Sequence, residues 1–190
     1  MSATSFYGNG GVSTPAINII NLSGLTGTGA TATHDNNSNS ATMWHAADAN
    51  PGTGPATVDD QSLTFSLGGA YNISDMYVWN HNQAGLTARG VNQFDLFVSS
   101  DGTNFTQIIT DGSLAQAGGG VELAQTINFG STQLNITHVR LEIDSAHSGS
   151  TNDYVGLSEV AFEATAAVPE PTSLTLLSLG GVALIFRRRK

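Results

Sequence analysis

Five histidines supply the side chains that most often act as metal ligands or as general acids and bases near neutral pH. No two of them have the spacing of a zinc-binding helix such as His-Glu-x-x-His. The chain also lacks a Gly-x-Ser-x-Gly turn, which presents a nucleophilic serine in many hydrolases. The histidines are His34, His45, His81, His138 and His147. Their spacing selects no catalytic group.

Two adjacent carboxylates, Asp59 and Asp60, come nearest to a paired-acid site. Neighbours in an extended segment point to opposite faces, which does not suit the facing pair of a glycosidase. We expect these residues to cap or turn the chain, and we predict a protein that is not an enzyme. A hydrolase is the less favoured alternative, which turnover of a model glycoside or ester would reveal.

A dense group of hydrogen-bonding side chains follows Trp79. Amide and guanidinium groups can bind neighbouring sugar hydroxyls in pairs, and an aromatic ring can cover the apolar side of a pyranose. Two alternatives remain open: Arg89 can pair with a carboxylate, and Trp79 can belong to the core. The polar groups are Asn80, His81, Asn82 and Arg89, with His147, Asn152 and Tyr154 in a later segment.

Charge is distributed unevenly along the chain. Four of the six basic residues are the last four, which leaves Arg89 and Arg140 against fourteen acidic residues upstream of Pro169. Nucleic-acid binding needs several lysines or arginines to displace counterions, so we predict no nucleic-acid partner. The chain has no cysteine, which excludes disulfides and thiolate metal sites. An acidic body rich in Gly, Asn and Thr suits extracellular work or divalent cations.

The apolar pattern that must position these groups is that of strands. Short runs alternate with a period of two, as in Val139, Leu141 and Ile143, and clusters of Gly, Asn, Asp and Ser separate them. About eight short strands without helical periodicity predict an all-β sandwich. The expected strands cover residues 17–22, 63–67, 73–80, 94–98, 125–129, 138–144 and 157–163.

Two kinds of connection are visible between these strands. Asp101-Gly102, within residues 100–104, predicts a tight hairpin, because both residue types tolerate positive φ. Residues 26–54 and 112–120 predict loops. The first is long for a compact domain, so it is either a functional or metal-held loop or a simple surface connection.

Several segments in this order resemble the discoidin, or coagulation-factor C-type, family of the galactose-binding-like superfamily. They are Thr42-Met43-Trp44, Leu-Thr-Phe-Ser-Leu-Gly at 63–68, Arg89-Gly90-Val91, Ser-Asp-Gly-Thr-Asn-Phe at 100–105 and Gly-Leu-Ser-Glu-Val-Ala-Phe at 156–162. The resemblance covers most of residues 16–166 and implies a jelly-roll β-sandwich.

The same resemblance implies two sites. Many bacterial members hold a structural calcium between the early polar loop and a glutamate of the closing strand, and calcium prefers six to eight oxygen ligands. The family's acid is replaced by asparagine here, although an acid lies two residues earlier; the alternative is a metal-free polar loop. The calcium set is Asp35, Asn37, Asn39, Thr42 and Glu159.

Sugar-binding members of the family carry their ligand site on loops at one end of the sandwich. By this resemblance the expected ligand-binding residues are Asn80, His81, Asn82, Arg89, His147 and Asn152. The implied function is a non-catalytic module that binds carbohydrate or an exopolysaccharide matrix. The alternative is a structural protein of the envelope or biofilm matrix without a defined ligand.

The end of the chain, residues 167–190, resembles the PEP-CTERM sorting signal. It has the motif Val168-Pro169-Glu170-Pro171, an uncharged span at 172–186 and a basic end at 187–190. The resemblance implies export and processing by an exosortase. Basic residues favour the cytoplasmic side, which leaves the body outside. The span falls short of the ~20 apolar residues of a full crossing, so an amphipathic core helix is the alternative.

These parts together predict an exported protein of the cell envelope or surface. We expect a flexible segment at residues 1–15, the sandwich at 16–166, and a short hydrophobic helix in the tail that anchors the protein transiently in the membrane. Residues 1–11 have no basic region followed by an apolar one, so no secretory signal peptide is visible.

Overall fold

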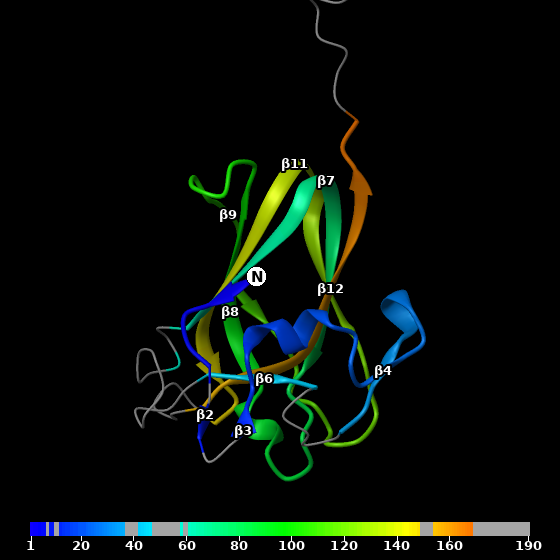
Figure 1. The fold of residues 1–190 in the computed structure, drawn as a ribbon, viewed down its shortest axis with the longest axis vertical. Helices are drawn as coiled ribbons and strands as arrows, with labels where there is room; N and C mark the ends of the chain where they lie inside the picture. Colours follow the sequence, from blue (N-terminus) through cyan, green and yellow to red (C-terminus); the bar gives the residue numbers. More distant parts are fainter. Residues whose placement is uncertain are drawn as a thin grey trace, which may run out of the picture.

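The architecture is an all-β sandwich, shown in Figure 1. It was obtained as a computed structural model, which describes residues 1–6, 8–9, 12–36, 42–46, 58, 61–148 and 154–168. The described residues contain short 3-10 helices but no α-helix. The main strands are β1 (Ser2–Ala3), β6 (Trp44–His45), β7 (Ser62–Asn80), β8 (Val91–Ser99), β9 (Thr106–Ser113), β11 (Gln125–Ala146) and β12 (Gly156–Ala166).

Two long strands, β7 and β11, form both layers of the sandwich. They pair antiparallel along most of their length, with register shifts between Asn128 and His138 of β11. Gly68 and Gly130 have positive φ, which lets each strand turn sharply where the pair folds over at the upper end of Figure 1. The sequence predicted two separate strands at 63–67 and 73–80, whereas the structure joins them across this bend.

The bend separates the hydrogen-bonded strands into two layers. In one layer, the first half of β7 pairs with β1 and with the second half of β11, which pairs in turn with β8 and then β9. In the other, the second half of β7 lies between β12 and the first half of β11, and β6 pairs with β12. The two inner faces enclose the core.

The alternating residues of the strands fill that core, as their period of two predicted. On β11, Val139, Leu141 and Ile143 are buried, and β8 contributes Phe94 and Leu96. Trp79, whose role the sequence left open, is also buried and donates its Nε1 hydrogen to the Ala32 carbonyl at 3.0 Å. Trp79 therefore belongs to the core.

Residues 17–22 do not form the expected strand. Ala16–Ile20 is instead a 3-10 helix, η1, which follows Pro15. Its period is three rather than two, so Ile19 is fully buried while Ile17 and Ile20 face solvent. The prediction of a strand was wrong because an apolar run of this length suits a strand and a short helix equally well.

The remaining short elements form the connections. They are β2 (Gly8–Asn9), β3 (Val12–Ser13), β4 (Leu25–Thr26), η2 (Gly29–Thr31), β5 (Thr33–His34), η4 (Thr87–Arg89) and β10 (Glu122–Leu123). β5 pairs with β4 and β10, so the loop predicted at 26–54 contributes the central strand of a small three-stranded sheet. The hairpin at Asp101 joins β8 to β9 as predicted.

The two ends of the chain were predicted to be a flexible segment and a hydrophobic helix. Ser2–Ala3 pairs with β7, so part of the segment expected to be flexible belongs to the sheet. The helix predicted for the tail lies outside the described residues. Among those that are described, no helix is both long and apolar enough to cross a membrane.

Candidate functional site

The end of β7 and the loop after it carry the polar residues singled out in the sequence, but they are buried. Asn80 donates from Nδ2 to the carbonyls of Val91 and Ala115, at 2.8 and 2.9 Å, and its Oδ1 accepts from the amides of His81 and Val91. All of its hydrogen-bonding capacity is used inside the protein. Asn80 therefore closes the base of the loop rather than facing a ligand.

Asn82 is likewise an internal connector. Its amide nitrogen donates to the carbonyls of His34, Asp35 and Gly120, and its oxygen accepts from the Ser158 hydroxyl at 2.9 Å. It is fully buried. The side chain therefore connects its own loop, the His34–Asp35 segment and the loop at Gly120 to β12. It does not lie on the surface.

His81 is also fully buried and contacts His45 of β6, with 3.2 Å between their Nε2 atoms. Burial, then the nearby charges of His45, Arg89 and His34, lower the pKa of His81 to about 2. Burial and Arg89 lower the pKa of His45 to about 4. Both rings are neutral at physiological pH. Sequence reasoning missed His45, because nothing in its spacing predicts that it meets His81.

Three other residues meet in a partly exposed group that we call the Arg89 corner: Arg89, His147 and Tyr154. The Arg89 guanidinium lies 4.4 Å above the centroid of the Tyr154 ring. The His147 amide donates to the Gly90 carbonyl at 3.0 Å, which holds that residue beside the end of η4. Among the described residues, no carboxylate forms an ion pair with Arg89.

The Arg89 corner therefore combines a cation and an aromatic ring at the surface. The guanidinium carries a planar fork of N–H donors, and a tyrosine ring has an apolar face. The helix η4 lies at the lower end of Figure 1, opposite the bends of β7 and β11. Asn152, which the sequence placed with this group, lies outside the described residues.

The expected calcium ligands fall partly within the described residues. Glu159 is fully buried on β12, beyond an irregularity in its pairing with β7, and among the described residues neither carboxylate oxygen has a partner with ordinary hydrogen-bond geometry. Burial raises its pKa to about 8, although the amides of Leu22 and Val160 partly oppose the rise. A buried carboxylate that two backbone amides approach, and that has no ion pair among the described residues, is a chemical fit for a hard cation.

Asp35 approaches the same turn as Glu159. A Cβ added to Gly24 would lie 3.3 Å from Asp35 Oδ1, and the amide of Leu22, in the same turn, faces Glu159. The Asp35 side chain is 46% exposed. Thr42 is buried on the loop before β6. Asn37 and Asn39 lie outside the described residues, so the structure places Asp35 and Glu159 around one turn and leaves the rest of the set open.

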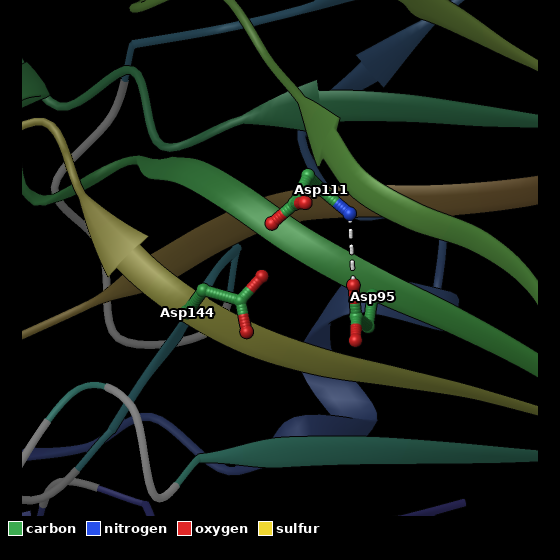
Figure 2. A group of neighbouring side chains, drawn as sticks. All are labelled: Asp95, Asp111 and Asp144. Atoms are coloured by element: carbon green, nitrogen blue, oxygen red, sulfur yellow. Dashed lines mark hydrogen bonds between the residues drawn. The ribbon is translucent and has the colours of Figure 1, made fainter.

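A second acidic group lies on the outer face of the other layer, where the sequence gave no warning of it. Figure 2 shows Asp95 of β8, Asp111 of β9 and Asp144 of β11 facing one another, with carboxylate oxygens within 4.8 Å. Asp95 accepts from the Asp111 amide at 2.9 Å. Such exposed groups are common without an ion. Asp95 and Asp144 occupy outward-facing positions of alternating strands, but Asp111 lies at a positive-φ position of β9, so no local pattern predicts that the three acids meet.

Comparisons with known proteins agree with this architecture. The family model described as F5/8 type C domain matches residues 14–160, and the model for the PEP-CTERM protein-sorting motif matches residues 167–190. No curated protein is significantly similar to the chain.

Several solved structures have the same fold. One is CpGH89CBM32-5 from Clostridium perfringens, in complex with GalNAc-β-1,3-galactose, with 23% identity, TM-score 0.56, and coverage of 85% of this chain and 91% of that one. The family 32 CBM of C. perfringens NanJ, in complex with galactose, has 18% identity, TM-score 0.51 and coverage of 85% and 90%. A pectin-binding carbohydrate binding module has 14% identity, TM-score 0.54 and coverage of 89% and 94%.

Proposed function

Residues 14–160 of this chain belong to the F5/8 type C domain family, and from that membership we propose that the protein is an exported, non-catalytic module that binds carbohydrate at the Arg89 corner. The observation that carries the proposal is the stacking of Arg89 on Tyr154 at a partly exposed end of the sandwich. The guanidinium binds neighbouring hydroxyls, and the ring covers an apolar sugar face.

The class of ligand follows from the fold and from this chemistry together. Two modules with the same fold were solved with galactose or a galactose-containing disaccharide. His147 adds an imidazole beside Gly90, and its Nε2 is buried without a partner among the described residues. We therefore take a neutral sugar, presented by an exopolysaccharide or another matrix glycan, as the ligand.

Calcium is proposed as a structural cofactor of the same module. Asp35, Asn37, Asn39, Thr42 and Glu159 would hold it, and the buried carboxylate of Glu159, which has no ion pair among the described residues, supports this assignment. A divalent cation would supply the counter-charge that this glutamate lacks. The cation would also join the turn at Leu22 to β12. This strand begins two residues after Tyr154.

The PEP-CTERM motif directs the protein to export and envelope sorting. We propose that an exosortase recognises Val168, Pro169, Glu170 and Pro171, and that the hydrophobic span after them anchors the chain transiently in the membrane. This places the sandwich on the outer side, where matrix glycans are available.

The test is glycan-array binding by the full chain, with calcium and with a chelator. We expect Arg89→Ala to lower binding by more than about tenfold, because a charge-assisted pair of hydrogen bonds is lost. Arg140→Ala is the matched control, since Arg140 also stacks on an aromatic ring, 4.3 Å from the Phe105 centroid, but on another face. Equal loss in both variants would contradict the assignment.

A structural role in the envelope or matrix is the second candidate. It is favoured by the burial of Asn80, His81 and Asn82, which removes three of the expected ligand groups from the surface. If the folded chain binds no glycan in either condition, and Arg89→Ala leaves cell-surface behaviour unchanged, this second function replaces the first.

A further inference from the structure

His45 and His81 form a buried pair of imidazoles. Their ring centroids are 4.4 Å apart with an angle of 66° between the planes, and their Nε2 atoms are 3.2 Å apart. His81 is fully buried and His45 is 8% exposed. A hydrogen bond of this length needs one proton between the two nitrogens, so the pair is satisfied when both rings are neutral and one donates.

A proton added to this neutral pair would meet no counter-charge among the described residues. The titratable or charged groups that face it are His34 from β5 and Arg89 from η4, and both oppose a further positive charge. In the part of the chain that the structure describes, no carboxylate lies within ion-pair distance of either ring. The Nδ1 of His81 has no hydrogen-bond partner there either.

His45 packs against Gly156, in the segment that follows Tyr154 of the Arg89 corner. A Cβ added to Gly156 would come within 2.6 Å of His45 Cδ2, and His45 pairs with Gly156 in the sheet. Gly156 follows Tyr154 by two residues. Any displacement of the His45 ring therefore acts on the backbone that carries Tyr154.

His81 is close enough to Arg89 for the charge of Arg89 to lower its pKa. It begins the loop that runs from β7 to η4, where Arg89 is located. Gly90, the next residue after Arg89, forms a bridge with Gly156. The two segments that build the corner thus meet at Gly156, which His45 contacts.

We propose that the His45–His81 pair is an acid sensor that weakens carbohydrate binding at the Arg89 corner as the pH falls. The proposal rests on the binding function proposed above. One added proton makes one ring cationic close to the charge of Arg89, and a second added proton places two cationic rings side by side; separation of β6 from the loop after β7 relieves this repulsion. This separation moves Tyr154 away from Arg89 and opens the corner.

The direction of the effect follows from proton linkage. In the closed arrangement burial keeps the pKa of His45 at about 4 and that of His81 at about 2, below the 6.5 of a solvated imidazole. Separated rings therefore bind protons more readily than paired rings. Acid favours the open arrangement, beginning below pH 6.5 and increasing toward pH 4.

The test is a pH titration of the isotope-labelled full chain from about pH 7.5 to about pH 4.5, which brackets an ordinary histidine pKa. NMR signals of the two imidazoles and of Arg89 and Tyr154 are followed, and galactose affinity is measured at each pH. We expect the corner signals to move together with protonation of the pair, and affinity to fall by about tenfold between neutral pH and about pH 5.

Variants separate the pair from other titrating groups. His45→Gln and His81→Gln each remove one ring and should flatten the pH response of the corner. His138→Gln is the matched control, because His138 lies beside Gly102 of the β8–β9 hairpin and should retain the wild-type response. Circular dichroism at each pH verifies that the chain stays folded.

The outcomes are distinct for the two proposals. Corner signals that stay fixed while the pair takes up its proton, or an unchanged pH response in both glutamine variants, overturn the acid sensor. If the chain does not bind galactose at neutral pH, that result counts against the proposed carbohydrate-binding function with this sugar. The NMR signals of Arg89 and Tyr154 still decide whether acid opens the corner.

Discussion

At the scale of single residues, the side chain of Asn80 forms hydrogen bonds with backbone groups at both ends of the loop that carries Arg89. Its four bonds join the amide of His81 to Val91 and to the Ala115 carbonyl. The residue type revealed donors and acceptors that a sugar could use. Whether these donors and acceptors bind a sugar or the protein depends on burial. In Asn80 all of them bind backbone groups of the protein.

The acidic group of Figure 2 gives a prediction at the same scale. Burial and the charges of Asp95, Asp111 and Glu142 raise the pKa of Asp144, so its charged form is less favourable in the folded protein than in the unfolded chain. Asp144→Asn removes that charge and should raise the free energy of unfolding by less than about 1 kcal/mol, because solvent screens the repulsion. Urea unfolding at neutral pH measures the change.

The same substitution at Asp101 should have the opposite sign. Hydrogen bonds from Asn104, Thr103 and Ser99 hold the pKa of Asp101 well below its usual value, so its charged form stabilises the hairpin. Asp101→Asn should therefore lower the free energy of unfolding, and the wild-type contribution should be lost only in strong acid. Stabilisation by both variants would contradict this account of the two carboxylates.

At the scale of elements, η1 shows why a short apolar run is ambiguous. Ile17, Ile19 and Ile20 suit a strand by composition, but three residues per turn send them to different faces. Neither propensity nor alternation over so few residues separates the two elements. The packing of the helix against β12 and β6 decides the outcome.

This packing predicts a sharp difference between neighbouring isoleucines. Ile19 is fully buried, whereas Ile17 is 55% exposed. Ile19→Ala should cost about 2–5 kcal/mol of unfolding free energy, because it leaves a cavity. Ile17→Ala should change it by less than about 0.5 kcal/mol. Similar losses in urea unfolding would show that η1 is not docked as described.

At the scale of the whole molecule, a cation at Glu159 would join the early loop to the closing strand. We expect calcium to raise the unfolding temperature of the full chain relative to a chelator, by about 2–4 °C for each kcal/mol of binding free energy, because it binds only the folded state. Differential scanning calorimetry measures the shift.

The matched pair of variants for this prediction lies on one strand. Glu159→Gln should abolish the calcium response, whereas Glu163→Gln should retain it, since Glu163 is exposed and accepts a hydrogen bond from Tyr77. An equal calcium response in wild type and Glu159→Gln would remove Glu159 from the proposed ligand set.

The sequence by itself determined the all-β class, most strands and the Asp101 hairpin, because alternation and turn chemistry are local properties of the chain. The order of its motifs also determined the family and the sorting tail. It further identified Arg89, His147 and Tyr154 as polar and aromatic groups of loops.

Only the tertiary structure decided which of these groups face solvent. Asn80, His81 and Asn82 are buried because two bent strands fold into separate layers and bring loops over the end of β7. The contact of His45 with His81, residues 36 apart, has the same origin. Such proximity depends on which strands become neighbours, and no local pattern records that choice.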